Sequence, residues 1–438
     1  MDPENPVIQD GILLARAGKI EFIGSPKDSP DYQAKKTIFA GSRYILPPFF
    51  NQHTHLSLSL YRGLGTDLRL HDWLQRVIWP LEKAYCNPEN VYLGALLSLV
   101  EMIKNGTGTL ADMDFHSLAI GKAVSESGLR AFLGEGLFDE ATPSAKTPSD
   151  TFEYSANLIS RYADDELISV YLTPHAPFSC SPELYEKTGE KARKWNIPVC
   201  SHVSETQQEV ENIRTKYGIS PVELLERTGV LDDHFIAVHG IHLNEKDIEI
   251  LVRKKVSVIH NPHSNMVLGS GVCPVPQLIS CGVKVGLGTD SAASNNHLSM
   301  LRELQTACRI HKGYNHDPEI LLSRKLLEMA TLSGHEIYRM KFSGKLKQGF
   351  KADFQIIDLS SIHNQPVIDP VISLVNSMHN RDIMTLVVNG QLIMEDREVL
   401  TLDEKLIIKE AMKFGKKVLY SFPGFLSGAN KVEEGGNL

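Results

Sequence analysis

The chain repeats one pattern about eight times, in which a short apolar run rich in β-branched residues precedes a longer segment with helical spacing. This alternation predicts repeated β-α units and a parallel sheet. Eight such units close into a (β/α)8 barrel of the TIM type, so we expect an α/β fold built on one barrel. The expected strands are 44–50, 107–111, 130–133, 168–173, 198–201, 235–238, 256–259 and 283–288.

Nearly every expected strand ends in a residue that can bind a metal ion or move a proton. These residues are His53, Asp112, Glu135, His175, His202, His239, His260 and Asp290. In a barrel the C-terminal strand ends meet at one mouth, where active sites lie. Taken singly, a histidine such as His260 is better explained as a satisfied core residue, and Asp290 can be explained as a turn residue. Their shared position at strand ends favours one common site.

His53 and His55 are the first candidates for metal ligands. Two imidazoles two residues apart at a strand end can both face one ion, although a chain with 17 histidines contains such a pair easily by chance. His202 and Asp290 would complete three imidazoles and one carboxylate, which leaves a position open for water, as in catalytic zinc sites. We therefore expect one divalent metal ion, with Zn²⁺ as the first candidate and Fe²⁺ or Mn²⁺ as alternatives.

Glu205 and His239 are the candidates for acid–base chemistry. Glu205 stands three residues beyond His202 and past the strand end, so it could reach a substrate without binding the metal and serve as a proton shuttle. A solvated acid in the first turn of a helix is the alternative for Glu205. His239 ends another strand, where it could orient or polarise the water that the metal activates.

Both ends of the chain carry short strand-like runs outside the barrel. Turn signals at 17–19 and 389–390 separate runs that we expect to be antiparallel strands of one small β-sandwich domain. A helix is expected at about 403–421, before a Gly-rich tail. The expected division is 1–43 and 344–400 for the small composite domain, 44–343 for the catalytic barrel, and 401–438 for the helix and tail.

The composition excludes several classes of partner. The net charge of −8 would repel phosphate backbones, so we expect no nucleic acid partner. No apolar run approaches the roughly 20 residues of a membrane span, and the first residues lack the features of a signal peptide, so we expect a cytoplasmic protein without a membrane partner. The six cysteines show no Cys-x-x-Cys spacing, which indicates neither a disulfide framework nor a thiolate metal site.

The order of the motifs resembles the amidohydrolase superfamily over nearly the whole chain. The motifs are His53-Thr-His55, His202-Val-Ser-Glu205-Thr, His239-Gly and Gly288-Thr-Asp290-Ser-Ala-Ala-Ser294. Further segments resemble the 5'-methylthioadenosine/S-adenosylhomocysteine deaminase group of that superfamily. They are Arg62-Gly63, Trp73-Leu74, Ile78-Trp79-Pro80-Leu81-Glu82, Asp112-Met113 and His260-Asn261-Pro262-His263-Ser264-Asn265. The lysine expected to bridge two metals after the fourth strand is absent, so the resemblance implies one metal ion.

The resemblance implies a role for each matching residue. It makes His53, His55, His202 and Asp290 the metal ligands and Glu205 and His239 the acid–base pair, in agreement with the reasoning from the residues. The implied reaction is hydrolytic deamination of 5'-methylthioadenosine, 5'-deoxyadenosine or S-adenosylhomocysteine to the inosine analogue and ammonia. Glu205 would protonate the ring nitrogen and Asp290 would accept a proton. The substrate contacts implied are Glu82 on the ribose hydroxyls, with His175, Glu205 and Ser294 in the same pocket.

Two departures from the group carry expectations of their own. Relatives that bind S-adenosylhomocysteine are expected to have an arginine near the third strand end, where this chain has Glu135. Because like charges repel, we expect a preference for neutral 5'-substituents. The first residues fall where relatives have already completed a strand, so the small domain is expected to lack an edge strand, and an exposed edge would promote a homo-oligomer.

Three other interpretations remain open from the sequence. A guanine deaminase or a triazine-type chlorohydrolase would share the fold, although Glu82 favours a nucleoside over a bare base. A non-catalytic scaffold would usually have lost ligands that this chain retains. In the third, the barrel is generic and its histidines are structural.

Overall fold

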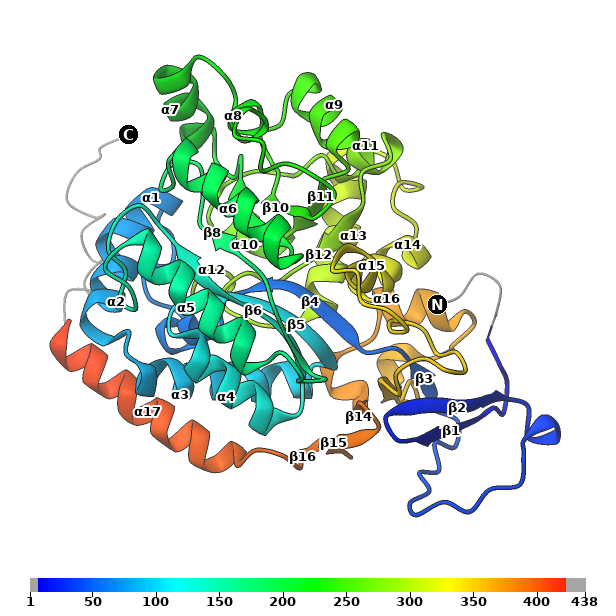
Figure 1. Cartoon of the computed structure of the whole chain (residues 1–438). Coiled ribbons are helices and arrows are strands. Elements are labelled where there is room, and N and C mark those ends of the chain that lie inside the picture. Colours follow the sequence, from blue (N-terminus) through cyan, green and yellow to red (C-terminus); the bar gives the residue numbers. More distant parts are fainter. Residues whose placement is uncertain (1–6, 423–438) are drawn as a thin grey trace, which may run out of the picture.

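The computed structural model describes residues 7–422, and its centre is a closed barrel of parallel strands (Figure 1). The strands pair in the orders β4-β5-β6-β7 and β9-β10-β11-β12, with the short β8 beside β6. Their bounds are β4 (Phe49–Thr54), β5 (Thr107–Asp114), β6 (Arg130–Leu137), β7 (Ile168–Val170), β8 (Thr173–Pro174), β9 (Val199–Val203), β10 (Phe235–His239), β11 (Ser257–His260) and β12 (Val285–Leu287).

Backbone hydrogen bonds close the barrel at both seams between these two sheets. At one seam the Leu172 N–H donates to the Pro198 carbonyl, and the Cys200 N–H donates to the Leu172 carbonyl, each at 2.9 Å. At the other seam the Asp290 N–H donates to the His53 carbonyl at 2.9 Å. The predicted (β/α)8 barrel is thus confirmed, and its closure brings residues from the first and last strands together.

Helices surround the barrel and bury its outer face. The Asn87 side chain caps the start of α3 by accepting from the Asn90 N–H, and proline follows at the next position. The helices are α3 (Pro88–Lys104), α4 (Ser117–Ser127), α5 (Pro148–Arg161), α6 (Pro182–Trp195), α7 (Gln207–Tyr217), α8 (Pro221–Arg227), α9 (Glu245–Lys254), α10 (Pro262–Val267), α11 (Val275–Ser280), α12 (Ala292–Asn295), α13 (Met300–Tyr314), α14 (Ser323–Ala330) and α15 (Leu332–Ile337). Apolar side chains of strands and helices form one continuous core, which includes Leu110, Leu133 and Val258 of the strands.

The expected first strand, 44–50, is two strands in different sheets. β3 (Tyr44–Leu46) pairs antiparallel with β13 (Phe354–Ile357), whereas β4 begins the barrel at Phe49. Pro47 and Pro48 lie between them, and a residue without an N–H cannot continue a strand ladder as a donor. The barrel therefore begins at Phe49 rather than at residue 44.

The small sheet contains the hairpin that the sequence predicts at 389–390. Its order is β16-β15-β14-β13-β3, with β14 (Ile383–Val388), β15 (Gln391–Glu395) and β16 (Glu398–Val399), and α16 (Pro370–Asn376) lies between β13 and β14 in sequence. The other predicted hairpin, β1 (Ile12–Arg16) and β2 (Lys19–Gly24), is a separate ribbon that bonds to the chain through Ile20 and Phe350. The expectation of a missing edge strand concerns the first residues of the chain, and the Gly-rich tail is at its end; both lie outside the described residues. The homo-oligomer expected from an exposed edge stays a prediction.

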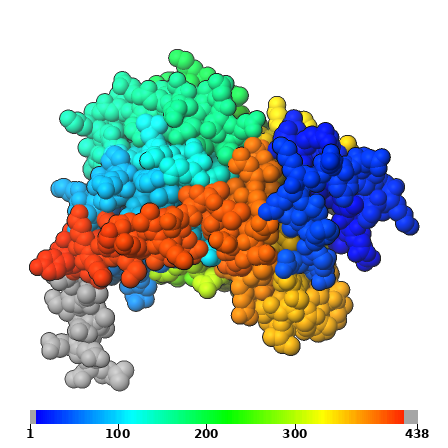
Figure 2. All heavy atoms as spheres, turned by 90° about the horizontal axis from the view of Figure 1, so that it is seen from below, coloured from blue at the N-terminus to red at the C-terminus, as the bar shows by residue number. Residues whose placement is uncertain are grey.

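The predicted C-terminal helix is α17 (Glu404–Ser421), which lies along the barrel side of the molecule (Figure 2). It packs on α3, and Phe414 inserts its ring beside Tyr61 and Tyr85. The contact of Lys104 Nζ with the Glu404 carboxylate at 2.9 Å joins the ends of the two helices. No helix among the described residues is both long and apolar enough to cross a membrane.

The segment that follows the first barrel strand is irregular and lies over the barrel mouth. It consists of α1 (Leu70–Trp73), a π-helical turn (Leu74–Ile78) and α2 (Trp79–Tyr85). Pro80 cannot donate the hydrogen bond of a regular helix, and the wider turn before it accommodates this loss. This arrangement brings Trp73, Leu74 and Glu82 to the cleft described below.

Candidate active site

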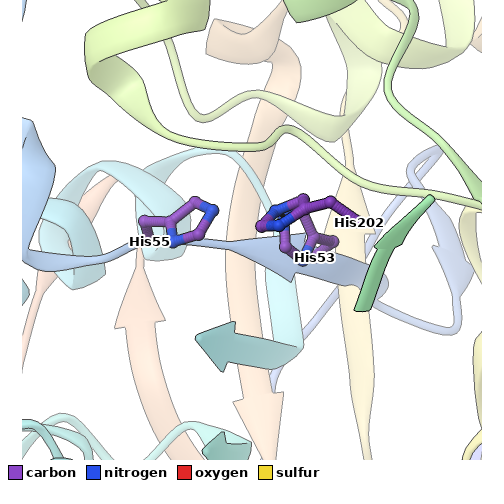
Figure 3. A group of neighbouring side chains, drawn as sticks. All are labelled: His53, His55 and His202. Carbon is purple, nitrogen blue, oxygen red and sulfur yellow. Dashed lines mark hydrogen bonds between the residues drawn. The ribbon is translucent and has the colours of Figure 1, made fainter. Parts of the chain in front are cut away.

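Three imidazoles and one carboxylate meet at the C-terminal mouth of the barrel. His53 and His55 come from the end of β4 and His202 from β9, and their ligand atoms lie within 4.8 Å of one another (Figure 3). Asp290 follows β12, with its Oδ1 at 3.3 Å from His55 Nε2 and 3.7 Å from His53 Nε2. The structure thus brings together the four residues that the sequence suggests as metal ligands.

Backbone carbonyls set the orientation of two of the imidazoles. His202 Nδ1 lies 2.8 Å from the His175 carbonyl, and His55 Nδ1 contacts the Met113 carbonyl. A carbonyl only accepts, so each Nδ1 carries a proton and each Nε2 is directed toward the site. His202 Nε2 lies 3.1 Å from His53 Nε2. This donor set, three imidazoles and a carboxylate on converging strand ends, fits a divalent metal ion.

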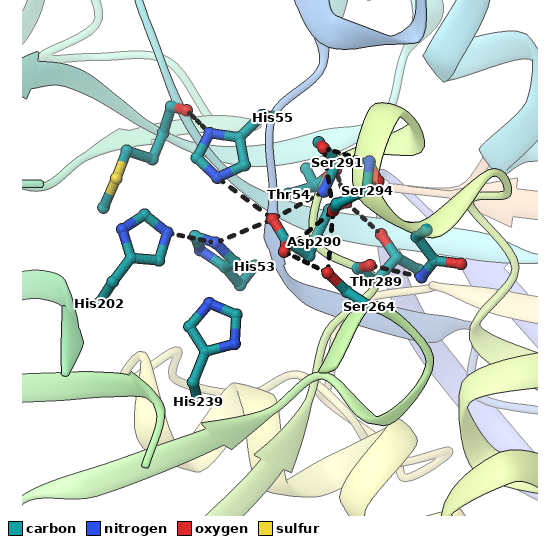
Figure 4. Close-up of polar contacts among 12 residues, drawn as sticks. His53, Thr54, His55, His202, His239, Ser264, Thr289, Asp290, Ser291 and Ser294 are labelled. Carbon is teal, nitrogen blue, oxygen red and sulfur yellow. Dashed lines mark hydrogen bonds and ion pairs between the residues drawn. The ribbon is translucent and has the colours of Figure 1, made fainter. Parts of the chain in front are cut away.

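Several hydrogen bonds converge on the carboxylate of Asp290 (Figure 4). Its Oδ2 accepts from Ser264 Oγ at 2.6 Å and Ser294 Oγ at 3.1 Å, and its Oδ1 accepts from the Ser291 N–H at 2.7 Å. Burial opposes ionisation, but the hydrogen bond and charge of His55 hold the pKa of Asp290 well below its usual range. Ser294 lies behind Asp290 and is not among the residues that line the cleft, so its geometry favours a contact with Asp290 rather than with substrate.

Glu205 and His239 face each other beside these ligands. His239 Nε2 lies 3.5 Å from Glu205 Oε2, and His239 Nδ1 lies 2.8 Å from Asn265 Oδ1. Burial, with the negative charge of Asp290, raises the pKa of Glu205 to about 8. A buried protonated acid next to a metal-binding set can deliver a proton to a substrate.

The backbone at three of the strand ends adopts the left-handed conformation. The φ angles are 52° at Ser204, 73° at His239 and 61° at Asp290. Side chains with a Cβ rarely adopt such angles, and this strain is typical of functional sites, where the surrounding structure enforces it. The turns at these positions therefore direct the side chains of Glu205, His239 and Asp290 into the barrel mouth.

His175 and Glu82 lie on the wall of the same cleft. His175 Nδ1 is 2.7 Å from Ser179 Oγ, and its ring stacks on Phe138 with centroids 4.5 Å apart. Burial, with the charge of His55, lowers the pKa of His175 to about 3, so the ring is neutral. Burial and the charge of Asp114 raise the pKa of Glu82 to about 8.

The rest of the cleft wall is mainly apolar and aromatic. It includes Trp73, Phe115, Phe138 and Phe178. The empty volume of the cleft is about 740 Å³, part of which is open solvent at its mouth. None of the described residues that line it is a lysine or an arginine. Such a cleft suits a small ligand with a neutral, largely apolar surface.

Glu135 does not face this cleft, so the premise of our charge-repulsion argument is wrong. Its carboxylate accepts from the N–H groups of His116 and Ser117, at 3.0 and 2.8 Å, and from Ser144 Oγ. It caps the start of α4, where a carboxylate is favoured. Gly136, the next residue on β6, lines the cleft instead.

Sequence reasoning missed Ser264 and Asn265, which hold Asp290 and His239. Both stand in the motif 260–265, but their roles became apparent only from the folded loops. Other residues at strand ends are not part of the site. His260 Nε2 pairs with His311 Nε2 at 3.1 Å, and Asp112 Oδ1 accepts from the Leu56 N–H at 2.7 Å. Of the histidines without an assigned role, His71 lies edge-on to Phe178 and His242 bonds to the Ser270 carbonyl.

Comparisons with known proteins agree with this geometry. The sequence profile of the amidohydrolase family matches residues 44–393. A 5-methylthioadenosine/S-adenosylhomocysteine deaminase of Aquifex aeolicus is 40% identical over 407 residues, which cover 93% of this chain and 94% of that protein. The enzyme of the same name from Pyrococcus furiosus is 39% identical over 377 residues, covering 85% of this chain and 87% of its own.

Solved structures show the same fold. An adenosine deaminase from Xanthomonas campestris with bound zinc has a TM-score of 0.92 at 30% identity, covering 94% of each chain. An atrazine chlorohydrolase from Arthrobacter aurescens, complexed with zinc, has a TM-score of 0.88 at 23% identity and supports the fold alone, covering 94% of this chain and 97% of its own. The chain belongs to the amidohydrolase family and, within it, to the group of its curated deaminase relatives.

Proposed function

We propose that this protein is a zinc-dependent deaminase of 5'-modified adenosines, which converts 5'-methylthioadenosine and related nucleosides to the inosine analogue and ammonia. One observation carries this proposal. Glu205, whose pKa is raised by burial and by the charge of Asp290, stands in the same cleft as the four predicted metal ligands, with His175 and Glu82 on the wall. The names of the relatives, at about 40% identity over most of the chain, support the same reaction.

The residues divide the proton transfers of a hydrolytic deamination. A bound metal supplies a Lewis acid that lowers the pKa of the attacking water. Asp290, held ionised by its neighbours, would accept a proton from that water and pass it to the amino group, which leaves as ammonia. Glu205, which lies 3.5 Å from His239, would donate a proton to the ring nitrogen next to the carbon under attack and regain one from the new hydroxyl group when the carbonyl forms. Asn265 fixes the tautomer of His239, so its Nε2 is free to orient the water.

The cleft wall supports a nucleoside as the substrate rather than a free base. Glu82 on α2 and His175 after β8 stand on the wall with the aromatic rings, which leaves polar contacts for ribose hydroxyls and apolar area for the remainder. A free guanine has no ribose hydroxyls for Glu82 to bind. The complete ligand set with its acid–base pair also disfavours a non-catalytic scaffold.

We also propose a preference for neutral 5'-substituents, because of the residues that line the cleft rather than because of Glu135. S-adenosylhomocysteine ends in a carboxylate and an ammonium group, and no lysine or arginine among the described lining residues could pair with the carboxylate. Desolvating an unpaired carboxylate is costly. Phe115, Phe138 and Phe178 suit a methylthio or methyl group better.

The test is ammonia release by zinc-loaded protein from 5'-methylthioadenosine, with S-adenosylhomocysteine, adenosine and guanine in parallel. We expect the highest kcat/KM with the methylthio compound, and loss of release after removal of the metal with a chelator, restored by Zn²⁺. Faster turnover of S-adenosylhomocysteine would reject the preference for neutral groups. Release from guanine alone, or from none of the four, would reject the proposed function.

A further inference from the structure

A second group of potential metal ligands lies behind the loop that carries Asp290. His263 is on α10, His297 follows α12, and Glu303 is on the first turns of α13; their ligand atoms lie within 4.8 Å of one another. The two rings are 4.3 Å apart between centroids, and His297 Nδ1 is 3.9 Å from Glu303 Oε1. We propose that His263, His297 and Glu303 form a second, structural site for a divalent cation of the zinc class.

The donor atoms are buried and several have no partner. Glu303 is fully buried and His297 is 6% exposed. Within residues 7–422, His263 Nδ1, His297 Nε2 and Asn295 Oδ1 are buried without a hydrogen-bond partner. Asn295 touches the same carboxylate, because its Nδ2 donates to Glu303 Oε1 at 2.7 Å. Buried polar atoms are nearly always satisfied, so three orphans around one carboxylate indicate a bound ion or water.

The two imidazoles are in the form that binds metals. Burial, His263 and the charges of Arg302 and Arg62 lower the pKa of His297 to about 3. Burial and Arg302 also lower the pKa of His263. Both rings are therefore neutral at physiological pH, and a neutral imidazole offers a lone pair to a cation.

Glu303 supplies the charge that a cation needs. Its carboxyl group is fully buried and accepts hydrogen bonds from the uncharged Asn295 amide and the His263 N–H. A divalent ion would supply the opposite charge that a buried carboxylate requires. Arg302 is exposed and Arg62 is paired with Glu101, so solvent and a carboxylate weaken their repulsion of a cation.

The carboxylate of Glu303 has hydrogen-bond partners, but its hydrogen bonds do not satisfy the ring nitrogens of the two histidines. Its oxygens accept from Asn295 Nδ2 and from the His263 N–H at 3.1 Å, which ties α13 to α10 and α12. Neither bond uses a ring nitrogen of His263 or His297. His297 Nδ1 accepts only a long bond, 3.3 Å, from the Ser299 N–H. A metal ion bound to one nitrogen of each ring would give His263 a partner and would replace the long Ser299 contact of His297 with a stronger interaction.

Such an ion would stabilise the loops on either side of Asp290. Ser264, the residue after His263, donates to Asp290 Oδ2, and Asn295 Nδ2 donates to the Thr289 carbonyl at 2.5 Å. The second site therefore connects the loops after β11 and β12. Because none of its three ligands lines the cleft, we expect it to affect stability more than turnover.

The test is the metal content of full-length protein that has been stripped with a chelator, reloaded with Zn²⁺ and separated from free metal. We expect about two Zn²⁺ per chain in the wild type, measured by mass spectrometry, because each deprotonated donor set binds one ion. His202→Asn removes a ligand of the catalytic site and should leave about one, whereas His202→Asn/His297→Asn should leave none. His316→Asn, at an exposed histidine, should keep the wild-type content.

The outcomes separate this proposal from the proposed function. A single ion in the wild type that is lost in His202→Asn would overturn the second site, as would an unchanged content in both His297→Asn and His263→Asn. A single ion that survives in His202→Asn but is lost in His297→Asn would support the second site and reject the catalytic metal. If the His297 variants do not fold, the zinc content of His202→Asn alone still tests the second site, because that substitution leaves the second site intact. One ion per chain would support the site, and none would overturn it.

Discussion

The two histidine clusters use similar residues in opposite surroundings. At the barrel mouth, carbonyls direct the Nε2 atoms of His55 and His202 into an open cleft, and Asp290 is held ionised. Behind it, His263 Nδ1 and His297 Nε2 lack hydrogen-bond partners, and Glu303 is fully buried with its pKa raised. The difference indicates that the first cluster is prepared for exchange with solvent and substrate. The second is suited to an ion that stays in place.

The largest predicted effect is a difference in kcat between two variants, each of which removes a buried carboxyl group from one of the two clusters. Burial raises the pKa of both Glu205 and Glu303 to about 8, but only Glu205 lines the cleft. We expect Glu205→Gln to lower kcat for 5'-methylthioadenosine by roughly 10³-fold, the size of a lost general acid. Glu303→Gln should retain kcat within about tenfold, since it removes no group that transfers a proton. Assays of ammonia release at saturating substrate would measure both.

Equal losses in these two variants would contradict the separation of the clusters. Folding of each variant would be checked by its thermal transition, since a general loss of structure would also remove activity.

The second prediction concerns pH. Glu205 acts in its protonated form, so activity should be constant below its pKa and fall about tenfold per pH unit above it. The midpoint of this fall in activity should lie at or below about pH 8, because a bound cation favours the carboxylate form of Glu205 and lowers its pKa. A profile of kcat against pH from 5 to 10 would measure it. The fall should disappear in the residual activity of Glu205→Gln, and its persistence there would assign it to another group.

The third prediction compares two hydroxyls that bond the same carboxylate oxygen. Ser264 Oγ lies 2.6 Å from Asp290 Oδ2 and Ser294 Oγ lies 3.1 Å away. A hydrogen bond to a charged group is worth about 1.5–3 kcal/mol, so Ser264→Ala should lower kcat by at least roughly tenfold. Ser294→Ala should lower it less. If Ser294→Ala instead raised KM and left kcat unchanged, Ser294 would be the substrate contact that the sequence resemblance implies.

Much of the barrel and the residues at its mouth could be predicted because each depends on local sequence. Strand runs alternate with helices, and residues after a strand must lie at the mouth whatever the details of packing. The direction of a side chain along a strand is harder to predict, since neighbouring residues face opposite sides and a shift of one residue exchanges them. Glu135 and Gly136 are such a pair: the sequence predicts that Glu135 faces the 5'-substituent, whereas Gly136 is the residue that lines the cleft.

Contacts between loops could not be predicted. Ser264 and His263 are adjacent, yet one bonds Asp290 and the other approaches His297, which is far away in sequence. Such pairings depend on how the loops after β11 and β12 fold over each other. The hydrogen-bonding role of Ser294 behind Asp290 is a further consequence of that packing. The second cluster had no signal in the sequence, because its three residues belong to no single motif.

The last prediction concerns stability rather than turnover, and it tests the second cluster by itself. In a His202→Asn background, Zn²⁺ can stabilise the fold only through the second site. Zinc at about 100 times its dissociation constant would add about 2.7 kcal/mol to the free energy of unfolding, which corresponds to a rise of a few degrees in Tm. Adding His297→Asn should abolish this rise, whereas adding His316→Asn should preserve it. With the catalytic ligands intact, His297→Asn should keep kcat within about threefold, because its ring touches neither the cleft nor Asp290. A Tm that responds equally to Zn²⁺ in all these variants would mean that the imidazoles behind Asp290 merely pack against each other.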